Sequence, residues 1–431
     1  MFAFMLSWCC KIYDFVYVGQ VADMRKTIVL LLMLLVLLMP FARSCSGTGS
    51  NAEPPEHMRT LTKEQMLADY DFFWDTLDKY CSPLAAMDSK KIEKIRKDHR
   101  SELENKDRPQ ATFFYSQLSQ AIKGLSYIGH LNMVGGYYLK ELRSAVAMGA
   151  ANIPDYGRLL SDEKVLASAE WIDEISGAES GAVKMLDDVI TEHIDQGISY
   201  IKIPSFLSAA METQGPRVSN WIEENIDDDA LILDIRGNSG GNGLYWYKYI
   251  LPYLLREDVY LTSYFYIRSW PEEPDCSNVS ERYDLDGRAS AAEYELIKGL
   301  PGFEPSDRLE DAVLYKQTSA FLADVDQKMF KGDIYLLTDG VTGSAAEDMA
   351  AVFKKAGIGT MIGQPSEQPN GNTVGLSPVC FALPNSRIPF VFQLQYIINS
   401  DGSCAQLYGI QPDIFCDGDP LEVCLNMIHE E

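Results

Sequence analysis

A serine lies between a predicted strand and a predicted helix in the C-terminal half of the chain. The segment Leu336-Leu-Thr-Asp-Gly-Val-Thr-Gly-Ser-Ala-Ala-Glu347 joins a strand ending at Thr338 to a helical pattern that includes Met349 and Phe353. Backbone N–H groups at a helix N-terminus can stabilise negative charge that develops on a reacting carbonyl oxygen. An isolated serine in this position is most often only a helix N-cap. Ser344 is therefore a candidate nucleophile, and other residues must decide between the two roles.

A glycine-rich turn in another part of the chain provides candidate partners for this serine. The turn Asp234-Ile-Arg-Gly-Asn-Ser-Gly-Gly241 follows the apolar run Ala230-Leu-Ile-Leu. Glycine has no Cβ, so the backbone at Gly240 and Gly241 can approach a ligand closely and offer its N–H groups. By itself such a turn is usually only a tight connection. Together with Ser344 it predicts an oxyanion hole.

Both turns follow short runs that are rich in β-branched residues. Such runs, bounded by Gly, Pro or Asp and alternating with helical patterns, are typical of buried strands in an α/β core. The predicted strands are residues 198–204, 230–235 and 333–338.

The first half of the chain has helical spacing instead. Apolar residues at helical intervals from Thr62 to about Leu125 predict a small helical domain, and Thr62-Lys-Glu-Gln65 has capping-box spacing. The next part, about 140–195, is mixed and mostly helical, with helices expected at Asp162–Ser176 and Ser180–Gln196.

Five segments, taken in order, resemble the C-terminal-processing and tricorn-type serine peptidases (serine-peptidase family forty-one). The resemblance implies a Clp protease/crotonase-like catalytic core of α/β (α+β) class, preceded by a small helical domain. It also implies that Ser344 is the nucleophile, with the amides of Ala345 and of Gly240 or Gly241 as oxyanion donors. The matching segments are residues 198–206, 231–241, 334–347, 362–363 and 409–413.

The family activates its serine in two ways. One branch uses a lysine some two dozen residues after the nucleophile. Here Lys354 and Lys355 are the only lysines after Ser344, and a side chain three turns along a helix, about 15 Å away, cannot reach back to its start. The other, tricorn-like branch uses a histidine before the core. The segment Leu125-Ser-Tyr-Ile-Gly-His130 keeps the Leu and His of that motif, with Ile128 where Asp is usual, so the resemblance assigns the general base to His130.

The tricorn-like branch also places a glutamate just before a Gly-Ile-x-Pro-Asp signature, as part of a relay. In this chain the corresponding catalytic candidate is Gln406. Glutamine can form hydrogen bonds but cannot neutralise an imidazolium. Three alternatives follow: the relay is weaker, Glu367 or Asp401 takes the place of the glutamate, or activity is lost.

The start of the chain indicates export. Met24-Arg-Lys precedes an almost unbroken apolar run from Thr27 to Pro40, which is typical of a secretory signal and short for a spanning helix. Cys45 follows a small residue and precedes a Gly/Ser-rich stretch, which resembles a bacterial lipoprotein cleavage site. Lipidation of Cys45 would anchor the protein to the membrane, with cleavage nearby or an uncleaved anchor as alternatives.

Composition limits the function further. The chain has 431 residues and a formal net charge of −25, which argues against nucleic acid as a partner. No Cys/His spacing suggests zinc, and no metal or organic cofactor is expected. Six cysteines follow Cys45. Disulfides among Cys380, Cys404, Cys416 and Cys424 would suit an exported protein, and six buried thiols fit equally well.

The expected organisation and function follow from these observations. We expect an exported serine peptidase of the periplasm or cell envelope that hydrolyses peptides or unfolded proteins through a Ser-His acyl-enzyme. The alternatives are a catalytically inactive peptidase-like lipoprotein that binds peptides or other ligands, and a crotonase-like acyl-CoA enzyme, which export disfavours. The expected segments are an upstream extension (1–23), a lipoprotein-type signal (24–45), a linker (46–57), a helical domain (58–135), a mainly helical connecting region (136–197) and the catalytic core (198–431).

Overall fold

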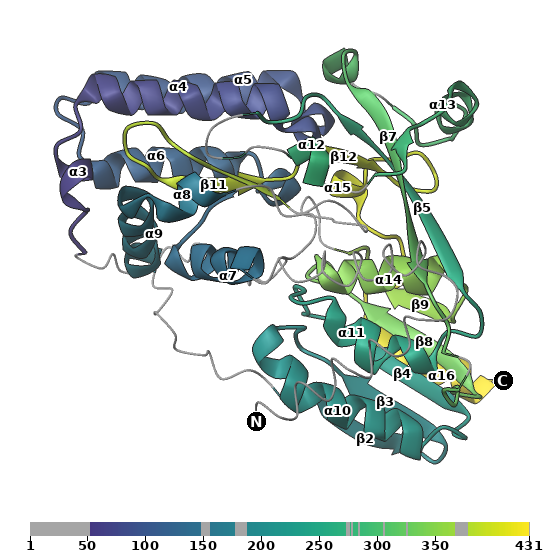
Figure 1. Cartoon of the computed structure of the whole chain (residues 1–431). Helices are drawn as coiled ribbons and strands as arrows, with labels where there is room; N and C mark the ends of the chain where they lie inside the picture. Colours follow the sequence, from purple (N-terminus) through teal and green to yellow (C-terminus); the bar gives the residue numbers. More distant parts are fainter. Residues whose placement is uncertain are drawn as a thin grey trace, which may run out of the picture.

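A computed structural model describes most of the chain after residue 51 (Figure 1). The described residues are 52–147, 156–176, 188–272, 276, 279–282, 285–304, 307–324, 326–366 and 378–430. The predicted extension and signal, Cys45 and Glu367 lie outside these ranges. No helix within the ranges is long and apolar enough to cross a membrane.

A six-stranded sheet lies at the centre of the lower half of Figure 1. Five of its strands are parallel, and β2 at one edge is antiparallel to β3. The three strand predictions are confirmed, because they correspond to β3, β4 and β8. In spatial order the strands are β13 (Ile414–Phe415), β9 (Thr360–Gly363), β8 (Asp333–Thr338), β4 (Ala230–Asp234), β3 (Ile198–Lys202) and β2 (Ile190–Asp195).

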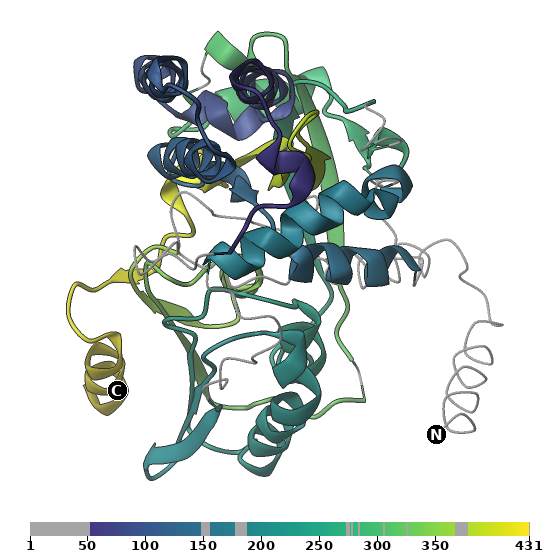
Figure 2. The same cartoon turned by 90° about the vertical axis from the view of Figure 1, so that its left-hand side faces the viewer.

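Helices cover both faces of this sheet. Leu231, Leu233 and Leu336 pack on one face with α10 (Ser208–Glu224), α11 (Leu244–Tyr249) and α14 (Ala345–Lys355). The parallel strands lie across the sheet in chain order, and right-handed crossovers therefore bring α10 and α14 to the same face. Ile232 and Leu337 point to the other face, where α16 (Pro420–Glu430) packs, as Figure 2 shows. The predicted α/β class is confirmed.

The upper half combines the N-terminal helices with strands from the C-terminal part of the chain (Figure 2). Its hydrophobic core joins Phe73 and Trp74 to Phe390 and Phe392, so the helical region shares one core with residues that follow the Ser344 turn in the sequence. The elements are α3 (Glu56–Arg59), α4 (Lys63–Tyr80), η1 (Ser82–Ala86), α5 (Ser89–Asn105), α6 (Ala111–Gly124), η2 (Ile128–His130), β1 (Asn132–Met133), α7 (Gly136–Ala147), α8 (Gly157–Ser161), α9 (Glu163–Ser176), β10 (Val379–Ala382) and β11 (Pro389–Phe392).

A four-stranded antiparallel sheet connects the two halves. Its strand order is β12-β5-β7-β6, and β5 and β7 rise along one side of the molecule from the level of α14 towards α12 (Figure 1). The remaining elements are η3 (Leu251–Tyr253), β5 (Val259–Ile267), α12 (Val279–Arg282), β6 (Gly287–Arg288), α13 (Ala291–Lys298), η4 (Asp307–Leu309), β7 (Val313–Phe321), β12 (Gln395–Ile398) and α15 (Ala405–Tyr408).

Local sequence patterns in the N-terminal half predicted some elements correctly and one wrongly. The capping box is confirmed, because Thr62 and Gln65 exchange both hydrogen bonds at the start of α4. The helix expected at Asp162–Ser176 is confirmed as α9. The helix expected at Ser180–Gln196 is wrong in its described part, since Ile190–Asp195 forms β2. The backbone N–H and C=O groups of this segment pair with β3 at the edge of the sheet. This pairing stabilises a strand more than the weak helical pattern stabilises a helix.

Two further expectations can be compared with the structure. Residues 52–57 belong to the expected linker, yet His57 lies within hydrogen-bond distance of Ser168 Oγ (3.0 Å) and α3 begins at Glu56. This end of the segment therefore contacts the folded body. The six described cysteines are all buried and form no disulfide with one another, and burial raises the pKa of Cys404 to about 12. The sequence left open whether these cysteines form disulfides or remain buried thiols, and in the structure they are buried thiols.

Candidate active site

The two turns that carry the candidate residues lie side by side. Asp234, the last residue of β4, is paired in register with Leu337 of the neighbouring parallel strand β8. The carboxyl ends of adjacent parallel strands meet at one edge of a sheet, which is where open α/β sheets bind ligands. The glycine-rich turn after β4 and the Ser344 turn after β8 are therefore neighbours.

Ser344 has a strained backbone conformation. Its φ of 52° and ψ of −123° lie where a residue with a side chain is rarely found. Such a conformation costs about 1–3 kcal/mol and persists only where surrounding contacts enforce it, most often at functional sites. Ser344 occupies the N-cap position of α14, yet its side chain makes no capping hydrogen bond. The helix-cap role is therefore not used here, and the geometry matches the sharp strand-to-helix turn that exposes a nucleophile.

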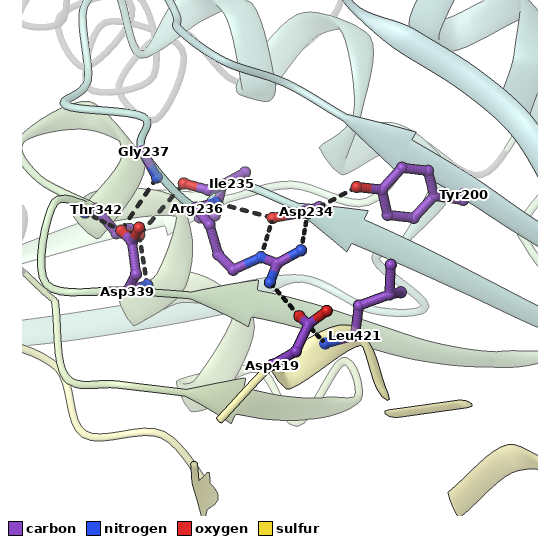
Figure 3. Close-up of polar contacts among 9 residues, drawn as sticks. All are labelled: Tyr200, Asp234, Ile235, Arg236, Gly237, Asp339, Thr342, Asp419 and Leu421. Carbon is purple, nitrogen blue, oxygen red and sulfur yellow. Dashed lines mark hydrogen bonds and ion pairs between the residues drawn. The ribbon is translucent and has the colours of Figure 1, made fainter. Parts of the chain in front are cut away.

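The Asp339 carboxylate holds the turn that precedes Ser344 (Figure 3). Asp339 Oδ1 accepts hydrogen bonds of 3.0 Å from the backbone amides of Val341 and Thr342. The same oxygen accepts a 3.0 Å bond from the amide of Gly237 in the glycine-rich turn. Thr342 Oγ1 in turn donates to the carbonyl of Ile235 at 3.2 Å. The two turns are thus joined by hydrogen bonds before any ligand binds.

Gly240 lies directly against Ser344, the candidate nucleophile. A Cβ at this position would be 2.7 Å from Ser344 Cβ and 2.8 Å from the amide nitrogen of Ala345, and φ is +100°. The amide of Gly240 already donates to Asn238 Oδ1 at 2.8 Å. Gly241 N–H makes no hydrogen bond within the described ranges, and Ala345 opens α14, so its N–H has no partner inside the helix. Of the predicted donors, Gly241 and Ala345 are therefore the available pair.

A buried ion pair anchors the start of the glycine-rich turn (Figure 3). Asp234 is fully buried and accepts from Arg236 Nε (2.9 Å), from Arg236 Nη2 (2.6 Å) and from the Tyr200 hydroxyl (2.7 Å). Arg236 Nη1 also donates to Asp419 at the start of α16 (2.6 Å). Hydrogen bonds that Arg236 donates to the Asp234 carboxylate raise the pKa of Arg236, so this cation stays charged. These contacts anchor the turn from the face of the sheet that α16 covers.

His130 lies in the upper half, at the end of η2. It is buried, has a φ of 59°, and its element contacts η1 and β11. Burial lowers the pKa of His130 to about 4, while a hydrogen bond with Gln393 acts in the opposite direction. The imidazole is therefore neutral at neutral pH, as a general base must be.

Gln406 uses both ends of its side chain to hold β12. Its Oε1 accepts from the amide of Ile397 at 3.0 Å, and its Nε2 donates to the carbonyl of Gln395 at 2.9 Å. Gln406 is fully buried, and an ionised glutamate could not donate the second bond. The side-chain amide of Gln406 therefore has a structural role, because its two hydrogen bonds join α15 to β12.

Glu347 and Asp401 are also held by local hydrogen bonds. Glu347, in the first turn of α14, is fully buried and accepts from Ser366 Oγ. Ser366 Oγ in turn accepts from the amide of Ile410 at 2.7 Å, so Glu347 ties the helix to the Gly409–Asp413 segment. Asp401 accepts from the amide (2.9 Å) and the hydroxyl (2.7 Å) of Ser403 within its own turn. This arrangement gives Glu347 a structural role.

The sequence interpretation missed Asp339, Asn238 and Asp419 as positioning residues. A signal existed for Asp339, because Asp followed by Gly after a strand is typical of a side chain that binds its own turn. Asp419 had no such signal, since it is far from Arg236 in the sequence.

Comparisons with known proteins agree with this fold. The family model described as Peptidase family S41 matches residues 197–415. The crystal structure of a proposed peptidase from Parabacteroides merdae ATCC 43184 is 15% identical, covers 84% of this chain and 96% of its own, and gives a TM-score of 0.51. The CPAF s499a mutant is 13% identical over 85% of this chain and 95% of its own, with a TM-score of 0.51. Mature CPAF complexed with lactacystin is 12% identical over 85% and 96%, with a TM-score of 0.50. None of the curated proteins matches the sequence.

Proposed function

Since this chain belongs to peptidase family S41 and is a serine-type peptidase, we propose that Ser344 is its nucleophile and His130 its general base. The proposed substrates are peptides or unfolded proteins outside the cytoplasm. The observation that carries the proposal is the strained, uncapped Ser344 beside Gly240, at the N-terminus of α14.

The proposed reaction is acyl transfer to Ser344. Its Oγ attacks the scissile carbonyl, and the imidazole of His130 takes the hydroxyl proton and later gives it to the leaving amine. The amides of Gly241 and Ala345 stabilise the oxyanion of the tetrahedral intermediate. Water then hydrolyses the acyl-enzyme by the reverse sequence of proton transfers. Asp339, Asn238 and Arg236 act only by holding the two turns in position.

A catalytic pair must come within hydrogen-bond reach, often only in the substrate complex. His130 lies on η2 among the elements of the upper half and Ser344 on the turn after β8, so the proposed catalytic pair forms between the two halves of the molecule. Gln406 contributes through β12 and not as a charged relay member. The proposed relay is therefore weaker than one with a carboxylate.

The proposal includes export and a lipid anchor at Cys45. Its support is the apolar run after Met24 and the small residue before Cys45. Such a protein would work in the periplasm or at the cell envelope, held at the membrane by its acylated cysteine.

The alternative is a peptidase-like lipoprotein that binds peptides without cleaving them. One observation favours it: the side chain of Gln406 is committed to hydrogen bonds with β12. Binding of unfolded protein without hydrolysis would support this alternative.

Hydrolysis of labelled casein by purified protein tests the role of His130. His130→Ala is expected to lower kcat by about a hundredfold or more, because general-base catalysis typically contributes at least that factor. Activity of the wild type requires neutral His130 and should disappear as pH falls through about 4, the lowered pKa of this buried residue, and not through the usual 6.5. His193→Ala, at an exposed histidine, is the matched control. Wild-type turnover by His130→Ala would remove His130 from the mechanism.

A further inference from the structure

A pocket of about 610 Å³ lies where the end of α4 meets β5, β6 and β7. It contains none of the proposed catalytic or oxyanion residues. Its volume falls in the range of about 300–1,000 Å³ that binding pockets usually have. The residues important for its chemistry are Lys79, Arg268, Trp270, Glu272, Arg288 and Tyr315.

The pocket is cationic in a strongly acidic protein. Lys79, Arg268 and Arg288 line it together with one carboxylate, Glu272, whereas the whole chain has a formal net charge of −25. Like-charged residues in a concave site with low-dielectric walls concentrate counter-ions there. The expected ligand is therefore an anion.

Arg268 has a donor available for that anion. Its Nη1 atom is buried and has no hydrogen-bond partner among the described residues. The backbone of Arg268 is fixed, since its amide donates to Ser82 Oγ at 3.0 Å. A buried charged donor without a partner costs more free energy than an ordinary unmade hydrogen bond. A carboxylate satisfies it best, because the guanidinium fork matches the two carboxylate oxygens.

Aromatic residues form a fixed part of the pocket wall. Trp270 Nε1 donates to the Tyr315 hydroxyl at 3.0 Å, and the two rings pack edge to face with centroids 5.5 Å apart. Arginine next to tryptophan and tyrosine is the combination that contributes most binding energy where polypeptides are recognised. The wall formed by Trp270 and Tyr315 can therefore pack against a peptide backbone next to the bound carboxylate.

We propose that this pocket binds a carboxylate of a polypeptide, paired with Arg268 and assisted by Arg288, and so favours acidic substrates. The carboxylate belongs to an Asp or Glu side chain or to a chain terminus. The choice of a polypeptide as ligand rests on the proposed function. The anion preference rests only on the pocket.

Peptide binding to the Ser344→Ala variant tests the proposal without hydrolysis. Three fluorescein-labelled peptides are compared by anisotropy: Gly/Glu with an amidated end, Gly/Ser with a free carboxyl end, and Gly/Gln with an amidated end. Either or both of the first two should bind at least about tenfold more tightly than the third, a difference of about 1.4 kcal/mol. Binding by the first assigns the carboxylate to side chains, and binding by the second assigns it to a terminus.

Three further variants in the same background locate the site. Arg268→Met should lower that affinity at least about tenfold. Arg288→Gln should lower it several-fold, and this exposed residue can change without disturbing the fold. Arg256→Met, at an exposed arginine outside the pocket, should bind as the parent does.

Equal affinity for all three peptides would overturn the proposal. So would unchanged affinity in both Arg268→Met and Arg288→Gln. Casein hydrolysis by the wild-type protein is measured in parallel. Hydrolysis without carboxylate preference rejects only the pocket, and carboxylate preference without hydrolysis rejects only the catalytic role.

Discussion

Ser344→Ala is expected to lower casein hydrolysis by at least about a thousandfold, because removal of the nucleophile from a serine peptidase leaves only the contribution of binding and of the oxyanion hole. The folded state should persist, since the Ser344 side chain caps nothing in α14. The measurement is kcat/KM for casein, with circular dichroism and the thermal midpoint as tests of folding.

Ser239→Ala is the matched control for this experiment. Ser239 lies in the glycine-rich turn beside Gly240, and its hydroxyl has no part in the proposed chemistry. This variant should keep most of the wild-type activity. If Ser239→Ala lost activity and Ser344→Ala kept it, the nucleophile would have been assigned to the wrong turn.

Gly240→Ala should have the second largest effect, a loss of about a hundredfold or more in kcat/KM. The new Cβ would lie 2.7 Å from Ser344 Cβ and 2.7 Å from the carbonyl oxygen of Gly343, both well inside contact distance. One of the two turns must move, and displacement of reacting groups by about 1 Å can cost a hundredfold in rate.

Gly237→Ala separates this clash from backbone strain. Gly237 also has a positive φ, of +79°, but no atom lies within 4 Å of its hypothetical Cβ. Both variants should lose about 1–2 kcal/mol of stability from the left-handed conformation, and only Gly240→Ala should lose most of its activity. Similar rates for the two variants would mean that the contact between Gly240 and Ser344 does not matter for catalysis.

Local patterns predicted the parts of the fold that depend on neighbouring residues. The capping box at Thr62 and the three strands of the central sheet were predictable, because each is specified by a few consecutive side chains. The strand β2 was missed because its residues do not alternate between apolar and polar, although Ile190, Thr191 and Ile194 are β-branched. Its pairing with β3 provides the missing stabilisation, and this contact is tertiary.

In the candidate site, too, some features could be predicted from the sequence and others could not. Ser344 and the glycine-rich turn could be found from residue types in order along the chain. The hydrogen bonds of Gln406 to Ile397 and Gln395 could not, because their meaning depends on how α15 packs on β12. The Arg268 pocket is likewise built by α4, β5, β6 and β7, which are far apart in the sequence.

Covalent labelling of the native protein is the most direct test of the claim that Ser344 is an activated nucleophile. A fluorophosphonate should add once per chain, and mass spectrometry of the digest should find the adduct on the peptide that contains Ser344. Labelling should be lost in Ser344→Ala and strongly slowed in His130→Ala, because the phosphorus centre is attacked by the same activated hydroxyl. An adduct on a different residue, or continued casein hydrolysis with Ser344 unlabelled after prolonged treatment, would contradict it.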